Sequence, residues 1–547
     1  MDDTYYARRI DMKLCLNDIK DAKAWQEKGI EVPAYDVSKI ADNTKKHPVW
    51  VHFGVGNIFR IFIGGIAEKL IEDGCSDKGI ICAETFDYDI VNKIYDPYDN
   101  LVLAVTLKPD GSTTKKVIGS LSEAIKGSCK DEAAWARLKE IFTDSGLQMI
   151  SFTVTEKGYA LKGADGNYLP YVLPDLENGP KAPTGAMAVV TALLYERYKK
   201  GAAPLAVVSM DNCSHNGEKL QGAVTTMAKE WLNRGLIEEG FIDYISNESK
   251  ISFPWSMIDK ITPRPSTEIA DGLEADGIEA MQPVVTDRNT YIAPFVNAEG
   301  PQYLVIEDKF PNGRPALEKA GVYLTDRKTV NEVERMKVTT CLNPLHTALA
   351  VYGCVLGYKS IAAEMQDEQL TKLVNGIGPV EGMKVVCDPG ILSPEAFVKE
   401  VIEQRLPNIF IPDTPQRIAC DTSQKVGIRY GETIKSYVEK YGSAKELKYV
   451  PIAIAGWLRY LLAVDDEGVK FDLSPDPMLE EMQAALSGIK LGDKASIGDK
   501  LKPVLSNANI FGSDLYKAGI GEKIEEIFAE EIAGPGAVRA TLKKYIG

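Results

Sequence analysis

A short apolar strand that runs directly into a glycine turn and an apolar helix is the feature that most restricts the fold of this chain. Residues 50–53, Trp-Val-His-Phe, are followed by Gly54-Val-Gly56 and by an apolar helical pattern that reaches about residue 73. Further patterns alternate along the chain: strands at 79–84, 101–107, 149–155 and 205–210, and helices at 131–143, 184–199 and 217–233. This alternation predicts an α/β fold with a mostly parallel, doubly wound sheet and right-handed crossovers.

The second half of the chain has a different pattern. Beyond about residue 285 the strand patterns fade, and helical patterns dominate residues 346–365, 394–404, 431–441, 450–464, 478–487 and 522–546. We therefore expect two domains. The first covers residues 1–285 and includes a helical N-terminal extension to about residue 47. The second, residues 286–547, is expected to be mainly α-helical.

Charge and cysteine usage narrow the class of protein. The 547 residues carry a net charge of −15, which argues against nucleic acid or an anionic membrane as a general partner. Nine scattered cysteines without a Cys-x-x-Cys pair are typical of reduced thiols, and the four histidines form no zinc-binding pattern. No apolar run reaches the length of a membrane span, and the N-terminus lacks an apolar signal core. We expect a cytoplasmic protein without a metal or a membrane partner.

The glycine turn has the composition of a dinucleotide-binding loop. Gly54 is suited to the turn, and Gly56 would let the backbone approach a pyrophosphate at the helix N-terminus. Phe59 occupies the place of the usual third glycine, so the same residues could also form a plain tight turn. Our predicted cofactor contacts in this loop are Gly54, Gly56, Asn57, Phe59 and Arg60.

An acidic residue ends the second strand, where a carboxylate commonly binds the hydroxyls of the adenosine ribose. Glu84 has this position, and Asp87 is a competing candidate. A carboxylate here would repel a 2′-phosphate, so the expected cofactor is NAD rather than NADP. The alternative interpretation is an exposed acid at the end of a strand.

A second cluster of polar residues precedes the apolar helix pattern of the C-terminal half. The cluster consists of Lys337, Asn343 and His346. A lysine that is desolvated among apolar neighbours can serve as a general base, and an amide can stabilise an alkoxide. The alternative is a solvated lysine, a helix cap and a packed histidine. Because Lys337 and His346 lie nine residues apart, they would face opposite sides of one straight helix. Pro344 therefore predicts a helix that starts there with Asn343 as its N-cap, while Lys337 lies on a separate turn or bulge.

Several motifs in a fixed order resemble the polyol-specific long-chain dehydrogenase/reductase family. They lie at residues 51–60, 153–159, 209–217, 253–263, 306–315, 334–350 and 413–425. The resemblance implies a Rossmann-type N-terminal domain with a helical C-terminal domain, and metal-independent hydride transfer between NAD(P) and a polyol, a sugar acid or its keto form. It further implies a monomer or weak homodimer.

The resemblance also assigns roles to individual residues. Lys337 is similar to the family's general acid/base, Asn212 and Asn343 to its oxyanion-stabilising pair, and His346 and Asp259 to its substrate-hydroxyl and base-orienting groups. One departure is that Lys337 precedes Asn343 by six residues, where the family usually has five. Two local alternatives remain: Asn212 in a turn cap with Asp211, and Asp259 in a surface ion pair with Lys260. Of the other histidines, we expect His52 in the core and His215 in a turn.

Two cations further along the chain bear on the substrate. Arg417 and Lys425 resemble the family's distal substrate contacts, although they could also be solvated charges. With Arg264, they could bind a sugar-acid carboxylate. The length and the N-terminal extension favour D-mannonate and D-fructuronate as the substrate pair. Mannitol with fructose, and tagaturonate, are the alternatives, and a non-catalytic NAD-binding regulatory protein is a further one.

Overall fold

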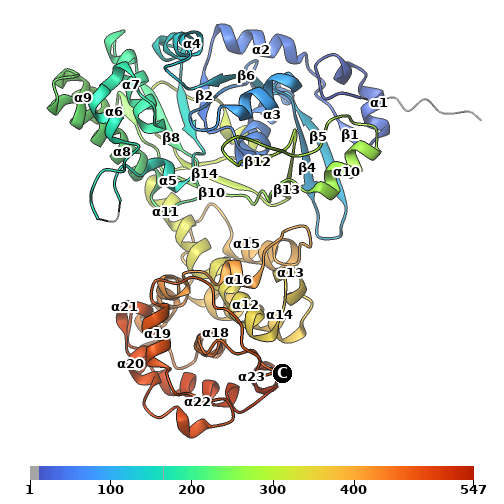
Figure 1. Cartoon of the computed structure of the whole chain (residues 1–547), viewed down its shortest axis with the longest axis vertical. Helices are drawn as coiled ribbons and strands as arrows, with labels where there is room; N and C mark the ends of the chain where they lie inside the picture. Colours follow the sequence, from blue (N-terminus) through green and yellow to red (C-terminus); the bar gives the residue numbers. More distant parts are fainter. Residues whose placement is uncertain (1–11, 164) are drawn as a thin grey trace, which may run out of the picture. The chain divides into compact units, whose positions relative to one another are not determined.

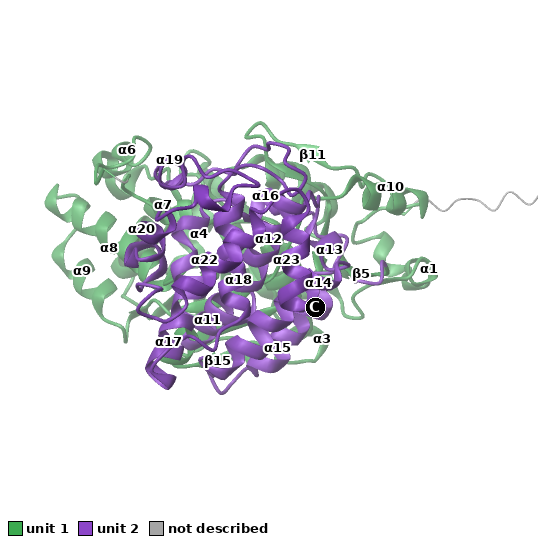
Figure 2. Cartoon of the chain, turned by 90° about the horizontal axis from the view of Figure 1, so that it is seen from below, with its two compact units in different colours: residues 1–107, 112–331 green, residues 108–111, 332–547 purple. Residues whose placement is uncertain are grey.

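The structure, a computed structural model, describes residues 12–163 and 165–547. The chain divides into two compact units (Figures 1 and 2). Unit 1 comprises residues up to 107 and 112–331, and unit 2 comprises residues 108–111 and 332–547. Each unit is described by itself below.

The core of unit 1 is a six-stranded, all-parallel sheet, which confirms the predicted α/β fold (Figure 1). Its strands, in spatial order, are β6 (Leu121–Lys126), β3 (Ile80–Glu84), β2 (Trp50–Phe53), β7 (Met149–Phe152), β8 (Leu205–Ser209) and β9 (Ile251–Ser252). The order reverses at β2, because the chain adds strands first on one side of it and then on the other. This is the topological switch point at which doubly wound sheets bind dinucleotides.

Apolar cores cover both faces of this sheet. Val51 and Phe53 point into one core, with α4 (Glu132–Thr143), α7 (Ala186–Lys199) and α8 (Asn216–Asn233). Trp50 belongs to the other core, with α3 (Gly64–Glu72). Burial on both faces explains why these strands read as continuous apolar runs.

Unit 1 contains more sheet structure than we expected. The strand predicted at residues 101–107 exists as β4 (Val102–Leu107), but it lies in a separate sheet of order β1-β5-β4-β13. It pairs antiparallel with β5 (Thr113–Ile118) and parallel with β13 (Phe295–Glu299). A third sheet joins β10 (Ser256–Asp259), β14 (Tyr303–Glu307) and β15 (Tyr323–Thr325), and β11 (Val284–Val285) pairs with β12 (Tyr291–Ile292).

Two expectations therefore change. The inference that strands fade beyond residue 285 is wrong, because β12 to β15 all follow that position. Residues 286–331 belong to unit 1 and not to the helical unit, because β13 and β14 pair with strands that precede residue 285. Because the paired strands are distant in sequence, the local residue pattern does not predict their pairing.

The described part of the N-terminal extension contains α1 (Ala22–Glu27), β1 (Ile30–Glu31) and α2 (Val37–Lys46). It is helical as expected, but β1 also adds a parallel edge strand to β5. Residues 1–11 of the predicted extension lie outside the described residues.

Unit 2 is helical, as predicted. Its central helices are α12 (Asn343–Leu356), α18 (Tyr449–Tyr460) and α22 (Gly521–Glu531), and α18 packs against the other two. The helix expected over 522–546 is two helices, α22 and α23 (Ala537–Ile546), because Gly534 and Gly536 adopt positive φ between them. The helix expected over 346–365 likewise ends at Gly357 and resumes as α13 (Ile361–Glu364). Within the described residues, no helix combines the length and apolarity needed to cross a membrane.

Candidate active site

The glycine loop lies at the carboxyl end of β2 and requires glycine at its first position. Gly54 has φ of +91°, and a Cβ atom there would lie 2.2 Å from the Thr153 carbonyl oxygen. Gly56 is different, since a Cβ atom there would have no heavy atom within 4 Å. The loop therefore combines a tight turn against β7 with open space beside its second glycine. This arrangement fits a dinucleotide pyrophosphate at the N-terminus of the following helix.

The other side chains of the loop make internal contacts. Arg60 is fully buried and donates hydrogen bonds to Asn57 Oδ1 (2.6 Å) and to the Ala293 carbonyl oxygen (2.7 Å). Burial lowers the pKa of Arg60 to about 10. Phe59 is also buried and stacks on His52 with ring centroids 4.2 Å apart. Phe59 and Arg60 are thus packed inside unit 1 and hold the loop in place.

Glu84 is buried at the end of β3 and connects this strand to the glycine loop. Its carboxylate accepts hydrogen bonds from the backbone N–H groups of Val55 (3.3 Å), Phe86 (2.7 Å) and Asp87 (3.1 Å). Burial raises the pKa of Glu84, and these backbone donors oppose that rise. The alternative of an exposed strand-end acid is wrong. The competing candidate, Asp87, accepts from the hydroxyls of Thr286 and Thr290, each at 2.6 Å.

The turn after β8 contains Asn212, which is exposed to solvent. The preceding Asp211 is buried and was not assigned from the sequence beyond a capping alternative. Its carboxylate accepts from the N–H groups of Val154 and Thr155, both at 2.9 Å, and from the Tyr159 hydroxyl at 2.5 Å. Burial raises the pKa of Asp211. Asp211 thereby fixes the segment after β7 beside the turn that carries Asn212.

The remaining expectations in unit 1 have clear outcomes. His52 is wholly buried between Ser151 Oγ (2.7 Å) and Thr153 Oγ1 (2.8 Å), which confirms its place in the core. His215 lies in the turn before α8, as expected. Asp259 is buried at the end of β10, and the adjacent Lys260 is buried and donates to the Glu299 carbonyl oxygen at 2.5 Å. Both side chains are therefore buried, so the surface location of the alternative is wrong.

Lys337 is buried in unit 2, at a break between two helices. α11 (Arg327–Met336) is followed by a π-helical turn over Lys337–Cys341, and α12 begins at Asn343. The Leu342 N–H donates to the Lys337 carbonyl oxygen (3.1 Å), five residues back. Lys337 and His346 thus do not share one regular helix, as predicted. The predicted cap is wrong, because Leu342 is the N-cap and Asn343 is already helical.

His346 lies on the first turn of α12 in electropositive surroundings. Its Nε2 is 3.4 Å from Asp413 Oδ2 but forms no hydrogen bond. Burial, and then the positive charges of Arg429, Arg417, Arg405 and Lys425, lower the pKa of His346 to about 3. The imidazole is therefore neutral at physiological pH and has one ring N–H donor and one acceptor nitrogen.

The cations around His346 differ in their partners. Arg417, on α16 (Pro415–Ile418), is exposed and pairs with Asp413. Lys425 is half-buried and donates to the Cys420 carbonyl oxygen at 2.5 Å, and burial followed by the charge of Arg429 lowers the pKa of Lys425. The Lys425 ammonium group is therefore partly withdrawn from water and bonded to the backbone. The sequence analysis did not identify three charged residues near His346, namely Asp413, Arg405 and Arg429. The one sequence feature that could have indicated Arg429 is its spacing of four residues from Lys425.

The structure brings Lys337, Asn343, His346, Arg417 and Lys425 into unit 2. The glycine loop, Glu84, Asn212 and Asp259 belong to unit 1. Among the described residues, no group of three or more His, Cys, Asp or Glu side chains is placed to hold a metal ion.

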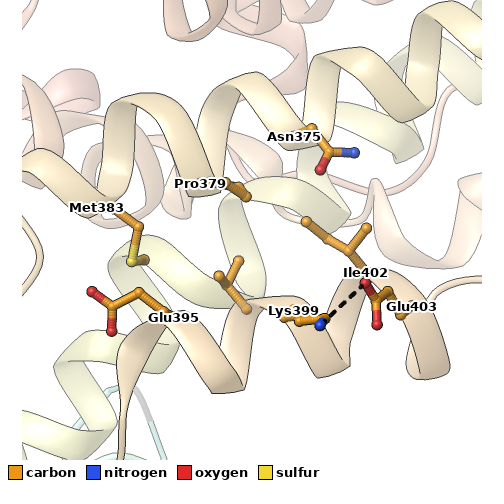
Figure 3. A pocket seen from close by; sticks show the side chains of 8 residues that line it. Asn375, Pro379, Met383, Glu395, Lys399, Ile402 and Glu403 are labelled. Atoms are coloured by element: carbon orange, nitrogen blue, oxygen red, sulfur yellow. Dashed lines mark ion pairs between the residues drawn. The ribbon is translucent and has the colours of Figure 1, made fainter.

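A separate hollow of about 260 Å³ opens in unit 2 between α14 (Glu368–Asn375) with its π-helical extension and α15 (Pro394–Glu400) (Figure 3). It is lined by Asn375, Pro379, Met383, Glu395, Val398, Lys399, Ile402 and Glu403. Lys399 pairs with Glu403 at 4.0 Å, and none of the lining residues is a candidate catalytic group. The hollow therefore does not form part of the candidate site.

Comparisons with known proteins agree with this arrangement. The chain is 54% identical to a D-mannonate oxidoreductase of Thermotoga maritima over 98% of this chain and 99% of the relative. Among solved structures it is similar to a D-sorbitol dehydrogenase in substrate-free form (TM-score 0.77, 26% identity, 94% of this chain and 97% of that chain). It is also similar to a mannitol 2-dehydrogenase of Pseudomonas fluorescens in ternary complex with NAD and D-mannitol (TM-score 0.66, 26% identity, 97% and 99% coverage). Residues 48–319 match the mannitol dehydrogenase Rossmann domain and residues 329–530 match the mannitol dehydrogenase C-terminal domain. The chain therefore belongs to the mannitol dehydrogenase family.

Proposed function

We propose that this protein is an NAD-dependent oxidoreductase that interconverts D-mannonate and D-fructuronate. The observation that carries the proposal is the positive charge around His346, to which Arg429, Arg417, Arg405 and Lys425 all contribute. A hexitol has no negative charge to balance such a set, whereas a sugar acid has a carboxylate. The similarity to a D-mannonate oxidoreductase supports the same substrate pair.

The side chains to which the family resemblance assigns roles supply the acid–base chemistry and the substrate contacts. In the direction of reduction, protonated Lys337 donates its proton to the oxygen of the ketone as that oxygen becomes an alkoxide. The family resemblance assigns the stabilisation of the negative charge on this oxygen to the amides of Asn343 and Asn212. Neutral His346 and Asp259 bind neighbouring hydroxyls, and Arg417 and Lys425 bind the carboxylate. Oxidation reverses each of these steps.

The glycine loop and Glu84 support NAD as the cofactor. The backbone at Gly54 and Gly56 would hold the pyrophosphate, and the nicotinamide would supply or accept the hydride. The Glu84 carboxylate lies at the carboxyl end of β3 and would repel a 2′-phosphate, which favours NAD over NADP.

The proposal includes a cytoplasmic location and a monomeric or weakly dimeric state. The nine cysteines are scattered along the sequence without a Cys-x-x-Cys pair, which agrees with a reducing compartment. Light scattering after size-exclusion chromatography would measure the oligomeric state.

The substrate is tested with NADH oxidation assays on D-fructuronate, D-tagaturonate and D-fructose. We expect kcat/KM to be highest with fructuronate. A higher value with fructose would contradict the proposal and favour mannitol 2-dehydrogenase activity, and no turnover of any of the three would favour a non-catalytic protein.

The role of Lys337 is tested with Lys337→Ala. Loss of the proton donor should lower kcat by roughly 10²- to 10⁴-fold, while the affinity for NADH, measured by fluorescence titration, should persist. Exposed Lys372→Ala is the matched control, because Lys372 pairs with Glu368 on the surface of the same unit. Unchanged turnover in Lys337→Ala would refute this assignment.

A further inference from the structure

The Arg429 side chain is a partly buried cation with no counter-ion in the part of the chain that the structure describes. It lies in the π-helical turn Gly427–Gly431, and Nη1 donates to the Thr347 hydroxyl. Among the described residues, no carboxylate lies within ion-pair distance of Arg429. Its remaining nitrogens are not among the buried polar atoms that lack a partner, so they stay accessible. Withdrawing a guanidinium from water without an opposite charge is costly, and an anionic ligand would offset that cost.

Other buried arginines of this chain are satisfied in a different way. Arg197 donates to five backbone carbonyl oxygens, those of Phe142, Asp144, Leu147, Ala203 and Pro204. Arg459 donates to three backbone carbonyl oxygens, those of Glu531, Val464 and Asp465. Arg429 has the same five N–H donors but one hydroxyl partner. The unused donors distinguish Arg429 from a structural arginine.

Arg429 is positioned next to the proposed substrate-binding groups. Its backbone N–H donates to the Lys425 carbonyl oxygen (2.9 Å), and its partner Thr347 directly follows His346 on α12. The Thr347 hydroxyl in turn donates to the Asn343 carbonyl oxygen at 3.0 Å. After burial, the charge of Arg429 is the largest influence that lowers the pKa of His346. A substrate that contacts His346 would therefore meet this guanidinium.

We infer that Arg429 is a specificity-determining residue that binds the substrate carboxylate and selects sugar acids over uncharged polyols. This inference rests on the proposed function. Arg417 already pairs with Asp413 and is exposed, whereas Arg429 offers several N–H donors in a fork that matches both oxygens of a carboxylate. Arg429 therefore adds a contact to those of Arg417 and Lys425.

The test measures KM and kcat for D-fructuronate in the wild type, Arg429→Met and Arg429→Lys. Loss of a charge-assisted contact should raise KM by roughly 10- to 100-fold in Arg429→Met, and Arg429→Lys should recover part of the loss. Arg234→Met is the matched control for net charge, because Arg234 is exposed and pairs with Glu230 on unit 1. It should leave KM unchanged.

Thr347→Val separates carboxylate binding from positioning of α12. It removes the protein partner of Arg429 but keeps the charge, so KM should rise by less than about threefold. An equal rise in Thr347→Val and Arg429→Met, or no rise in Arg429→Met, would overturn the inference. If circular dichroism shows that Arg429→Met does not fold, the comparison of Arg429→Lys with Thr347→Val tests the inference. In that case KM for D-fructuronate must rise more in Arg429→Lys than in Thr347→Val. A wild-type protein that does not reduce fructuronate would instead refute the proposed function.

Discussion

Two glycines of the dinucleotide loop make different demands on the backbone, and substitutions can separate them. Gly54→Ala should lower the free energy of unfolding by about 1–3 kcal/mol, because φ is +91° and the new methyl group would lie 2.2 Å from the Thr153 carbonyl oxygen. Gly56→Ala has room for its methyl group in the protein and should fold normally, but the methyl group would occupy space needed by the pyrophosphate. Urea unfolding and NADH titration measure the two effects. Equal loss of stability in both variants would contradict this distinction.

At the residue scale, the sequence predicted which kinds of side chain would be present better than it predicted the hydrogen-bond and ion-pair partners of those side chains. The pattern at 334–350 indicated a break between Lys337 and His346, and the structure has one. It indicated a separate turn or bulge at Lys337 but not its π-helical form, since an i+5 hydrogen bond leaves no compositional mark. Arg429 could not be singled out from the sequence, because the inferred role depends on the lack of a carboxylate partner. Ion-pair partners are set by tertiary contacts, which the sequence does not show.

At the element scale, the π-helical turn Lys337–Cys341 explains how the chain tolerates its departure from the family spacing. A π-helical turn contains an additional residue relative to an α-helical turn, and such turns often mark functional sites. The extra residue between Lys337 and Asn343 falls within or just after it. Leu342, with φ −128° and ψ −62°, then redirects the chain into α12.

The buried Glu364 on the short helix α13 should make the stability of the protein depend on pH. Glu364 is fully buried, neither carboxylate oxygen has a hydrogen-bond partner, and burial, followed by the charge of Asp367, raises its pKa to about 9. Because the folded-state pKa lies above the unfolded value, the folded protein binds more protons between them. The stability contributed by the protonated form is complete below about pH 4.5 and is lost as pH rises through about 9.

Glu364→Gln should flatten this dependence, since the amide keeps the shape but does not ionise. We expect the free energy of unfolding, measured in urea between about pH 6 and pH 9, to fall less steeply than in the wild type. A residual slope should remain because burial also raises the pKa of Glu531 to about 8. Glu368→Gln, at an exposed ion pair with Lys372, is the control and should keep the wild-type slope. Identical slopes for Glu364→Gln and the wild type would contradict the role of Glu364.

At the scale of the whole molecule, the sequence predicted the layer structure but not its full extent. Alternating apolar and helical patterns identified the parallel sheet, because its strands are buried on both faces and follow one another along the chain. The mixed sheet β1-β5-β4-β13 was missed, because its members come from residues 30–31, 102–118 and 295–299. Pairing between such distant segments leaves no local period, which also explains why the expected boundary at residue 285 differs from the division at residue 331.

The overall charge of the molecule predicts how salt acts on catalysis. The net charge of −15 repels an anionic substrate at long range, while the cations near His346 attract it locally. Salt screens the long-range repulsion, but partly buried charges such as Arg429 are screened less. At saturating NADH, kcat/KM for D-fructuronate should therefore stay constant or rise modestly between about 20 and 200 mM salt. D-Fructose, which is uncharged, is the control for effects on the chemistry. A fall of several-fold with fructuronate alone would mean that exposed cations such as Arg417, rather than Arg429, capture the carboxylate.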